Sequence, residues 1–510
     1  MVVESHAMIS TRLNSSNLFL SPLVVLPILF QGAVATATIF PKQENTEVIY
    51  LGTGRTAVQL VNQLMNESTV SLDALLSSWA VDEVGSPMIE TVRTLVKHNI
   101  NVNIIYDAGA TAAETTGDMN GDAGSLMADS SFTHPPHLVL ARFLNKISNG
   151  LVIDDYLHQK FLIIDAGRPT MKVIVQGGNF TETANHFIDS FFLLRPISPD
   201  QPWVGTTMSS YYGRIWEEYS KRFSVLAPAK PSQKLMDKLN LNLRAAKAAA
   251  DSPDRSDSDA EVTDPLLSFS HVMEVIHNGQ TDQLHDLDPI QFRPASAQFV
   301  TNDLFMNFFK EKGALVKSDM HEMPDDISDV LATKIYASKN ILLSNYGGEY
   351  NWRLKSALQS AMKENRQFEI VTNSPPAFES LAGGKSALKA FMATASNITI
   401  SEENKYLEQT ASHHNLHVYL SNQYRHAKLG IADETFWQGS ANLTISSSYY
   451  NDECMIFYED PRLAQFMRKE VQNQLDHSGF FELTLEKSRE WVKKIPFGDK
   501  LLAPFVELYL

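Results

Sequence analysis

The feature that most constrains this chain is a pattern of polar residues that occurs twice, far apart in the sequence. Each copy has a histidine and a lysine two positions apart, an aspartate five residues after the lysine, an asparagine after small residues, and an acid ten or eleven residues further on. The copies are His158, Lys160, Asp165, Asn179 and Asp189, and His426, Lys428, Asp433, Asn442 and Glu453. Because two copies in the same order are hard to produce by chance, the pattern predicts one site built from two related halves.

Short apolar runs follow the two lysines and are typical of buried strands: FLII in the first copy and LGIA in the second. Side chains alternate across a strand, so each histidine should face the same side as its lysine. The same alternation sends Asp165 and Asp433 to the opposite face, which predicts a structural role for both. Small residues before each asparagine let the backbone approach a ligand closely, although the first copy has Gly177 where the second has Ser440.

These residue types suit the cleavage of a phosphodiester. A neutral imidazole can attack phosphorus, and a protonated imidazole can supply the proton that the leaving alkoxide needs. Lysines and asparagines can stabilise the phosphate charge without a metal ion, so we expect no metal and no cofactor. A carboxylate that accepts a hydrogen bond from each imidazole would fix its tautomer, and Asp189 and Glu453 are the candidates for that role.

The paired motifs resemble those of the phospholipase D superfamily, in its two-copy, single-chain branch. That branch includes phospholipases D, cardiolipin and phosphatidylserine synthases, and some nucleases. The resemblance is strong over about residues 150–195 and 415–460. It implies an α/β fold of two α/β/α sandwich lobes related by a pseudo-twofold axis, with both motifs at the interface. It also implies a ping-pong mechanism through a phosphohistidine that water or an alcohol later attacks.

The resemblance assigns a role to each motif residue. It makes His158 the nucleophile and His426 the general acid, and it has Asp189 and Glu453 orient the histidines. The residues it implies for phosphate binding are Lys160, Lys428, Asn179, Asn442 and Ser440.

The rest of the chain alternates predicted strands and helices, which favours a layered α/β fold. We expect one lobe over 45–225, a linker over 226–265 whose early part could be a helix, and a second lobe over 266–510. Residues 108–135 lack periodicity and are predicted to be a loop. Within it, the run from Asp118 to Asp129 resembles a calcium loop but lacks its final glutamate, so an ordinary solvated loop is favoured.

Residues 1–37 are predicted to be a signal peptide or N-terminal hydrophobic segment. Leu18–Phe30 is almost entirely apolar, and Ala33-Val34-Ala35 has the small-x-small pattern of a cleavage site. The prediction is therefore a secreted or exported protein, with an uncleaved membrane anchor as the alternative.

The leading functional hypothesis is a phospholipase D or phosphatidyltransferase that acts on a phospholipid headgroup at a membrane surface, with water or an alcohol as acceptor. The alternative hypothesis is a nuclease or other phosphodiesterase, but a net charge of -16 weighs against a nucleic-acid partner. The third hypothesis is a binding module without activity. We expect a monomer. The C-terminal stretch Leu501–Leu510 is expected to pack on its own domain, although docking on a membrane or partner stays open.

Overall fold

The computed structural model describes most of the chain. The described residues are 39–107, 119–141, 143–146, 152–180, 188–250, 267–278, 287–302, 325–347, 350–364, 366–380, 386–412, 415–444, 447–448 and 451–506. The N-terminal segment interpreted as an export signal lies outside these residues, and its role stays a prediction.

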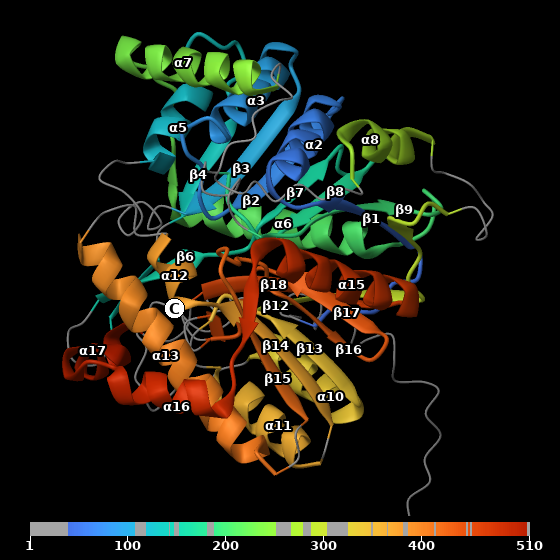
Figure 1. Ribbon diagram of the computed structural model, residues 1–510. Helices are drawn as coiled ribbons and strands as arrows, with labels where there is room; N and C mark the ends of the chain where they lie inside the picture. Colours follow the sequence, from blue (N-terminus) through green and yellow to red (C-terminus); the bar gives the residue numbers. More distant parts are fainter. Residues whose placement is uncertain are drawn as a thin grey trace, which may run out of the picture. The chain divides into compact units, whose positions relative to one another are not determined.

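One mixed sheet is built mainly from the first half of the chain (Figure 1). Its strands are β1 (Thr46–Gly52), β2 (Ser71–Leu76), β3 (Asn101–Asp107), β4 (His137–Ala141), β7 (Phe161–Ile164), β8 (Lys172–Gln176), β9 (Phe191–Pro196), β10 (Ser224–Val225) and β11 (Gln291–Phe292). They lie in the order β10-β4-β3-β2-β7-β8-β9-β1-β11. The neighbours β2, β3 and β4 are parallel, and the strands from β7 onward pair in antiparallel fashion.

A second mixed sheet comes mainly from the second half. Its strands are β5 (Phe143–Lys146), β6 (Val152–Leu157), β12 (Ser296–Asn302), β13 (Asn340–Ser344), β14 (Gln367–Asn373), β15 (Leu416–Ser421), β16 (Leu429–Ala432), β17 (Thr435–Gly439), β18 (Asn451–Glu459) and β19 (Phe480–Glu482). They lie in the order β19-β15-β14-β13-β16-β17-β18-β6-β5, and β12 also pairs with β18.

The two sheets repeat one topology. In each, three parallel strands (β2, β3, β4 and β13, β14, β15) continue into an antiparallel run (β7, β8, β9 and β16, β17, β18). The last strand of each run pairs with an earlier antiparallel strand, β1 in one sheet and β12 in the other. Each polar motif therefore leads into the equivalent strand of its sheet, β7 in the first and β16 in the second.

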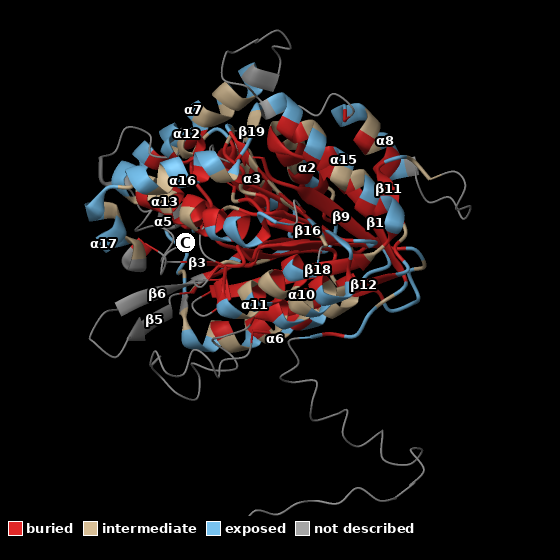
Figure 2. Cartoon of the chain, turned by 60° about the horizontal axis from the view of Figure 1, so that its bottom comes forward, coloured by how far each residue is buried: buried red, intermediate tan, exposed pale blue. Residues whose placement is uncertain are grey.

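Helices cover the sheets, which gives the expected α/β fold of two lobes (Figure 1). The helices with the first lobe are α2 (Gly54–Asn66), α3 (Gly85–Lys97), α5 (Met119–Met127), α6 (Val204–Arg222), α7 (Gln233–Ala250) and α8 (Phe269–Asn278). Those with the second are α10 (Asp326–Ala337), α11 (Trp352–Lys363), α12 (Pro375–Ser380), α13 (Ser386–Thr410), α15 (Pro461–Ser478), α16 (Leu485–Lys494) and α17 (Phe497–Val506). Figure 2 shows buried sheets between half-buried helices, because the helices present their apolar faces to a sheet or to a neighbouring helix.

Two helices join the lobes. Helix α6 contacts β4 and β9 of the first sheet and β12 of the second. Helix α15 contacts β17, and its Phe466 packs against Tyr50 of β1 and Phe292 of β11, at centroid distances of 5.4 and 5.2 Å. One hydrophobic core therefore continues from the first sheet into the second.

Two expectations about organisation need adjustment. The loop predicted over 108–135 is wrong at its centre, because Met119–Met127 forms α5, which buries Ala123 and Leu126. The early part of the expected linker is a helix, as the sequence allowed: α7 packs on α3 and α5. The sheets also exchange strands across the expected lobe boundaries: β5 and β6 join the second sheet, and β11 joins the first.

Within the described residues, no helix combines the length and the apolar character needed to cross a bilayer.

Candidate active site

Both His-x-Lys triplets lie immediately before a strand, so the prediction that they form part of it is wrong. Strand β7 starts at Phe161 and β16 at Leu429, one residue after each lysine. The backbone of each triplet pairs with the other lobe instead: the N–H of His158 donates to the carbonyl of Asp452 at 3.0 Å, and the N–H of His426 donates to the carbonyl of Ile188 at 2.9 Å.

The acids pair with the histidines crosswise. Nδ1 of His158 lies 2.8 and 2.9 Å from the two carboxylate oxygens of Glu453. Nδ1 of His426 lies 3.0 Å from Oδ2 of Asp189. Each carboxylate belongs to the motif copy of the opposite lobe. With Nδ1–H donated to a carboxylate, Nε2 of each ring carries the lone pair, which is the form that can attack phosphorus.

The two His–acid pairs are removed from water. The carboxylate side chains are fully buried, while the imidazoles of His158 and His426 are 14% and 13% exposed. Burial lowers the pKa of His158 to about 4 and that of His426 to about 3, against the opposing effect of the paired carboxylates. Burial works to raise the pKa of Asp189 and Glu453, but the contacts with their histidines outweigh it and the pKa of each acid falls. Both imidazoles are therefore neutral near pH 7.

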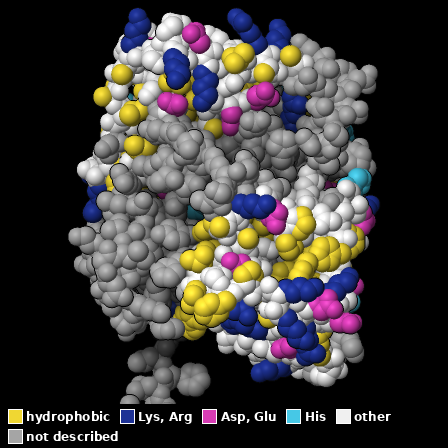
Figure 3. Space-filling view, turned by 60° about the vertical axis from the view of Figure 1, so that its left-hand side comes forward, with side chains coloured by type: hydrophobic (Ala, Val, Ile, Leu, Met, Phe, Trp, Pro, Cys, Tyr) yellow, Lys and Arg dark blue, Asp and Glu magenta, His cyan; other side chains and the backbone are white. Residues whose placement is uncertain are grey.

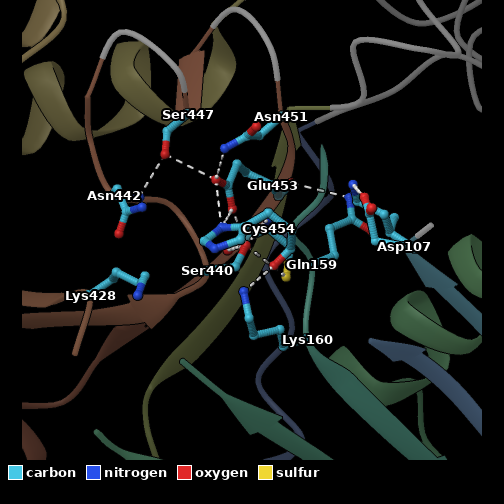
Figure 4. Close-up of polar contacts among 12 residues, drawn as sticks. Asp107, Gln159, Lys160, Lys428, Ser440, Asn442, Ser447, Asn451, Glu453 and Cys454 are labelled. Carbon is cyan, nitrogen blue, oxygen red and sulfur yellow. Dashed lines mark hydrogen bonds and ion pairs between the residues drawn. The ribbon is translucent and has the colours of Figure 1, made fainter. Parts of the chain in front are cut away.

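Glu453 is held by a set of side chains from its own lobe (Figure 4). The hydroxyl of Ser440 donates to Oε2, and Ser447 Oγ and Asn451 Nδ2 donate to Oε1 at 2.9 and 3.3 Å. Ser440 is fully buried, and its oxygen also accepts the N–H of Cys454 at 3.0 Å. The expected phosphate contact of Ser440 is therefore corrected: its hydroxyl is committed to Glu453. Nothing in the sequence singled out Ser447 or Asn451, because the first copy has no counterpart of either.

Asp189 is held mainly by close backbone packing. A Cβ atom at Gly177 would overlap Oδ1 of Asp189, and one at Gly178 would overlap Oδ2. The N–H of Ser190 donates to Oδ1 at 3.2 Å. The glycines of the first copy thus provide room for a carboxylate, at the place where Ser440 of the second copy provides a hydrogen bond.

The lysines have matching positions in the two lobes. Nζ of Lys160 donates to the carbonyl of His158 at 2.7 Å, and Nζ of Lys428 donates to the carbonyl of His426 at 2.6 Å. Burial, together with the charge of Lys160, lowers the pKa of Lys428 to about 7. The charges of both lysines also lower the pKa of both histidines, so all four groups act on one site. In Figure 4 Lys160 and Lys428 extend into the space below Glu453 from different sides.

Each motif asparagine adjoins a residue that contacts the acid of its own copy. Asn442 follows the Ser440-Ala441 pair, and its backbone N–H donates to Oγ of Ser447, which holds Glu453. Asn179 follows Gly178, where a Cβ atom would overlap Oδ2 of Asp189. Oδ1 of Asn179 is buried and has no hydrogen-bond partner among the described residues.

Asp165 and Asp433 lie at the far ends of β7 and β16, away from the histidines. Oδ1 of Asp165 accepts the backbone N–H groups of Thr69, Val70 and Ser71 at 2.8, 2.7 and 3.2 Å. Asp433 accepts the N–H groups of Lys339 and Asn340 at 3.0 and 2.9 Å. Both aspartates have positive φ, 53° and 49°, and each ties a hairpin turn to the start of the neighbouring strand.

Aromatic rings line one side of His426. Tyr346 lies edge-on to the imidazole and Tyr424 stacks on it, each with a centroid distance of 6.4 Å. Phe378 packs on both tyrosines. Sequence reasoning missed these residues. Tyr346 and Phe378 come from segments far from the motif, but Tyr424 stands two residues before His426 as Tyr156 stands two residues before His158, a repeat that could have pointed to it.

Among the described residues, no group of three or more His, Cys, Asp or Glu side chains is arranged to hold a metal ion. Asp129, the last position of the calcium-like run, pairs with Arg93 at 3.2 Å.

Comparison with known proteins gave matches at the level of sequence family and of fold. Residues 335–475 match the family model described as "Cardiolipin synthase, PLD-like domain", a range that includes the second motif. No curated protein matches this sequence.

Three solved structures are similar to different degrees. Phosphatidylserine synthase from Haemophilus influenzae Rd KW20 has a TM-score of 0.57 at 13% identity, over 94% of this chain and 99% of that one. Nuc, a phospholipase D family member from Salmonella typhimurium, has a TM-score of 0.23 at 17% identity, over 31% and 90%. Polyphosphate kinase from Porphyromonas gingivalis has a TM-score of 0.43 at 11% identity, over 97% and 57%. Of the three, only the synthase has a TM-score above 0.5, and at that identity it shows a shared fold.

Proposed function

Because this chain is a member of the phospholipase D superfamily, we propose that it cleaves the headgroup phosphodiester of a phospholipid through a covalent phosphohistidine. The observation that carries the proposal is the crosswise pairing of His158 with Glu453 and of His426 with Asp189 at one buried site. Two oriented imidazoles on one phosphate supply a nucleophile and an acid.

In the first step, Nε2 of His158 attacks phosphorus and the bond to the leaving oxygen breaks. His426, protonated at Nε2 in the bound complex, gives its proton to that oxygen. In the second step, neutral His426 takes a proton from water or an alcohol, whose oxygen attacks phosphorus and releases His158. With water as acceptor the net reaction is hydrolysis, and with an alcohol it is transfer of the phosphatidyl group to that alcohol.

Charge in the site supports this sequence of steps. Burial keeps both imidazoles neutral near pH 7, with the pKa of His158 at about 4 and that of His426 at about 3. An anionic phosphodiester between the rings favours a proton on one of them, and it also favours the charged form of Lys428. Lys160 and Lys428, with the amides of Asn179 and Asn442, would then stabilise the charge on the equatorial oxygens.

A lipid substrate has two further supports. The matched family model and the structure with the same fold are both named for enzymes that make phospholipids. The net charge of -16 also opposes the approach of a nucleic acid, whose binding depends on many phosphate contacts.

The test is a substrate panel with the purified protein. Release of headgroup from phosphatidylcholine, phosphatidylethanolamine or phosphatidylglycerol is measured beside cleavage of single-stranded and double-stranded DNA, with His426→Ala as the blank. We expect turnover of a phospholipid that His158→Ala and His426→Ala each abolish while they remain folded. Turnover of DNA alone would overturn the lipid assignment, and wild-type rates in either variant would overturn the mechanism.

A further inference from the structure

Helix α17 exposes a cluster of large apolar side chains. Phe497 is 76% exposed, Leu501 59% and Leu502 48%, and Phe497 is the most exposed large hydrophobic residue in the described part of the chain. Phe497 and Leu501, four positions apart, share one side of the helix, and Leu502 extends the exposed apolar surface around the helix. Exposed apolar clusters of this kind mark interaction surfaces.

The opposite side of α17 is anchored to the protein. Val506 is buried in a small core with Phe378 and Tyr424, and Ala503 packs against the same core. Helix α17 also lies against α13. The inner side of α17 is therefore fixed to the protein, and its outer side is exposed to solvent. The expected packing of this segment on its own domain applies only to the inner side.

Basic residues surround the apolar cluster. Lys493 and Lys494 at the end of α16 and Lys500 on α17 are all exposed. The nearby acid Asp499 accepts a hydrogen bond from Nδ2 of Asn397 at 2.8 Å. Lys494 pairs with Glu490 at 3.9 Å, so Lys493 and Lys500 carry the positive charge of this surface, which contrasts with the net charge of -16 of the whole chain. Figure 3 views this side of the molecule, where hydrophobic side chains gather over the lower half beside Lys and Arg.

A helix with one apolar face flanked by lysines is the kind that lies in the interface of an anionic bilayer. We propose that Phe497, Leu501 and Leu502, with the three lysines, form a docking face for the surface of an anionic phospholipid bilayer. The residues are Lys493, Lys494, Phe497, Lys500, Leu501 and Leu502.

The docking face lies close to the candidate active site. The core beneath α17 contains Tyr424, whose ring stacks on His426, and Tyr346 packs on that core and lies edge-on to the same imidazole. One layer of aromatic side chains thus separates the helix from the proposed general acid. Docking there would bring lipid headgroups to the candidate active site. This benefit rests on the proposed function, but the binding of the protein to vesicles can be measured without any turnover.

The first experiment measures co-sedimentation of the full chain with vesicles of phosphatidylcholine and phosphatidylglycerol. We expect Phe497→Asp/Leu501→Asp to lower the partition coefficient about tenfold or more. The matched control is Val225→Asp/Leu241→Asp, which changes residues 52% and 65% exposed elsewhere and should bind like the wild type. A wild-type protein that does not sediment with the vesicles, or a docking-face variant that sediments as the wild type does, overturns the proposal.

A second measurement reports insertion directly. The single cysteine, Cys454, is buried, so a fluorophore on Leu501→Cys labels one position. Its emission should shift to the blue on vesicles and be quenched by a quencher confined to the bilayer. If the face instead joins two copies of the chain, the wild type will be a dimer that does not bind vesicles, and Phe497→Asp/Leu501→Asp will be a monomer. That result would reject a bilayer as the partner.

Turnover separates this proposal from the proposed function. With a soluble phosphodiester the wild type and Phe497→Asp/Leu501→Asp should have equal rates, whereas on vesicles the variant should lose activity. If the protein binds vesicles through α17 but cleaves no phosphodiester, the proposal of a docking face is supported and the proposed enzymatic function is rejected.

Discussion

Nδ1 of His158 lies 2.8 Å from Oε1 of Glu453, although the two residues are 295 positions apart in the chain. The reciprocal contact joins His426 and Asp189 at 3.0 Å. Each lobe therefore supplies a histidine that the other lobe orients, and neither lobe contains a complete His–acid pair. The first three predictions concern this arrangement, and the fourth concerns the aspartates that stabilise the sheets.

Replacing Glu453 by glutamine should lower turnover of a soluble phosphodiester about 100-fold or more, because an amide does not stabilise an imidazolium. The paired carboxylate also raises the pKa of His158 against burial. Its loss should therefore move the acidic limb of the pH–rate profile to lower pH. Glu482→Gln is the matched control, since Glu482 pairs with His417 at 2.8 Å on the exposed surface and should have no effect. A folded Glu453→Gln protein with wild-type turnover and an unchanged profile would remove this residue from the mechanism.

In the free enzyme kcat/KM should fall on both sides of the pKa of His158: above it the protonated fraction of His426, whose pKa is about 3, decreases with each pH unit, and Lys428 makes the fall steeper near pH 7. His158 must be neutral to attack, so activity should fall as the pH drops through about 4, where its imidazole gains a proton. Lys428 must be charged to bind phosphate, so activity should fall more steeply as the pH rises through about 7. Lys428→Arg should move this steeper fall to higher pH, because a guanidinium keeps its proton far above neutral pH. A steeper fall that stays near pH 7 in Lys428→Arg would assign it to another group.

Gly178→Ala should lower kcat about 100-fold with a smaller change in KM. The added methyl group overlaps Oδ2 of Asp189, so the carboxylate must move away from His426, and small displacements of catalytic groups have effects of this size. Gly213→Ala on α6 is the control, because a Cβ there meets nothing within 4 Å. Equal kcat values for Gly178→Ala and the wild type would show that the position of Asp189 does not limit turnover.

Asp165→Ala should lower the free energy of unfolding by about 2 kcal/mol, because three backbone N–H groups, of which that of Ser71 is buried, lose a charged acceptor. Urea unfolding measures the change. The folded variant should keep its catalytic rate, since Asp165 lies at the far end of β7 from His158. Asp200→Ala changes an exposed residue and should stay within about 0.5 kcal/mol of the wild type. A loss below about 1 kcal/mol for Asp165→Ala would contradict a stabilising role.

Local patterns in the sequence predicted the strands and helices that flank the motifs, because side-chain periodicity reflects burial within a few residues. The apolar runs after the two lysines are strands β7 and β16, and the segments before them alternate strands and helices as predicted. The same reasoning was wrong at Met119–Met127, where a short helix lies in a stretch rich in small and polar residues. The family resemblance also assigned Ser440 to the phosphate, whereas in the structure its hydroxyl donates to Glu453.

The sequence by itself determined which residues have the chemistry for phosphodiester cleavage, because their types and spacing repeat in both motif copies. Only the tertiary structure decided which acid serves which histidine. That choice depends on how the lobes pack, where the carbonyls of Asp452 and Ile188 accept the N–H groups of the opposite histidines. A hydrogen bond between residues hundreds of positions apart leaves no trace in local spacing, so the crosswise pairing exists only in the folded chain.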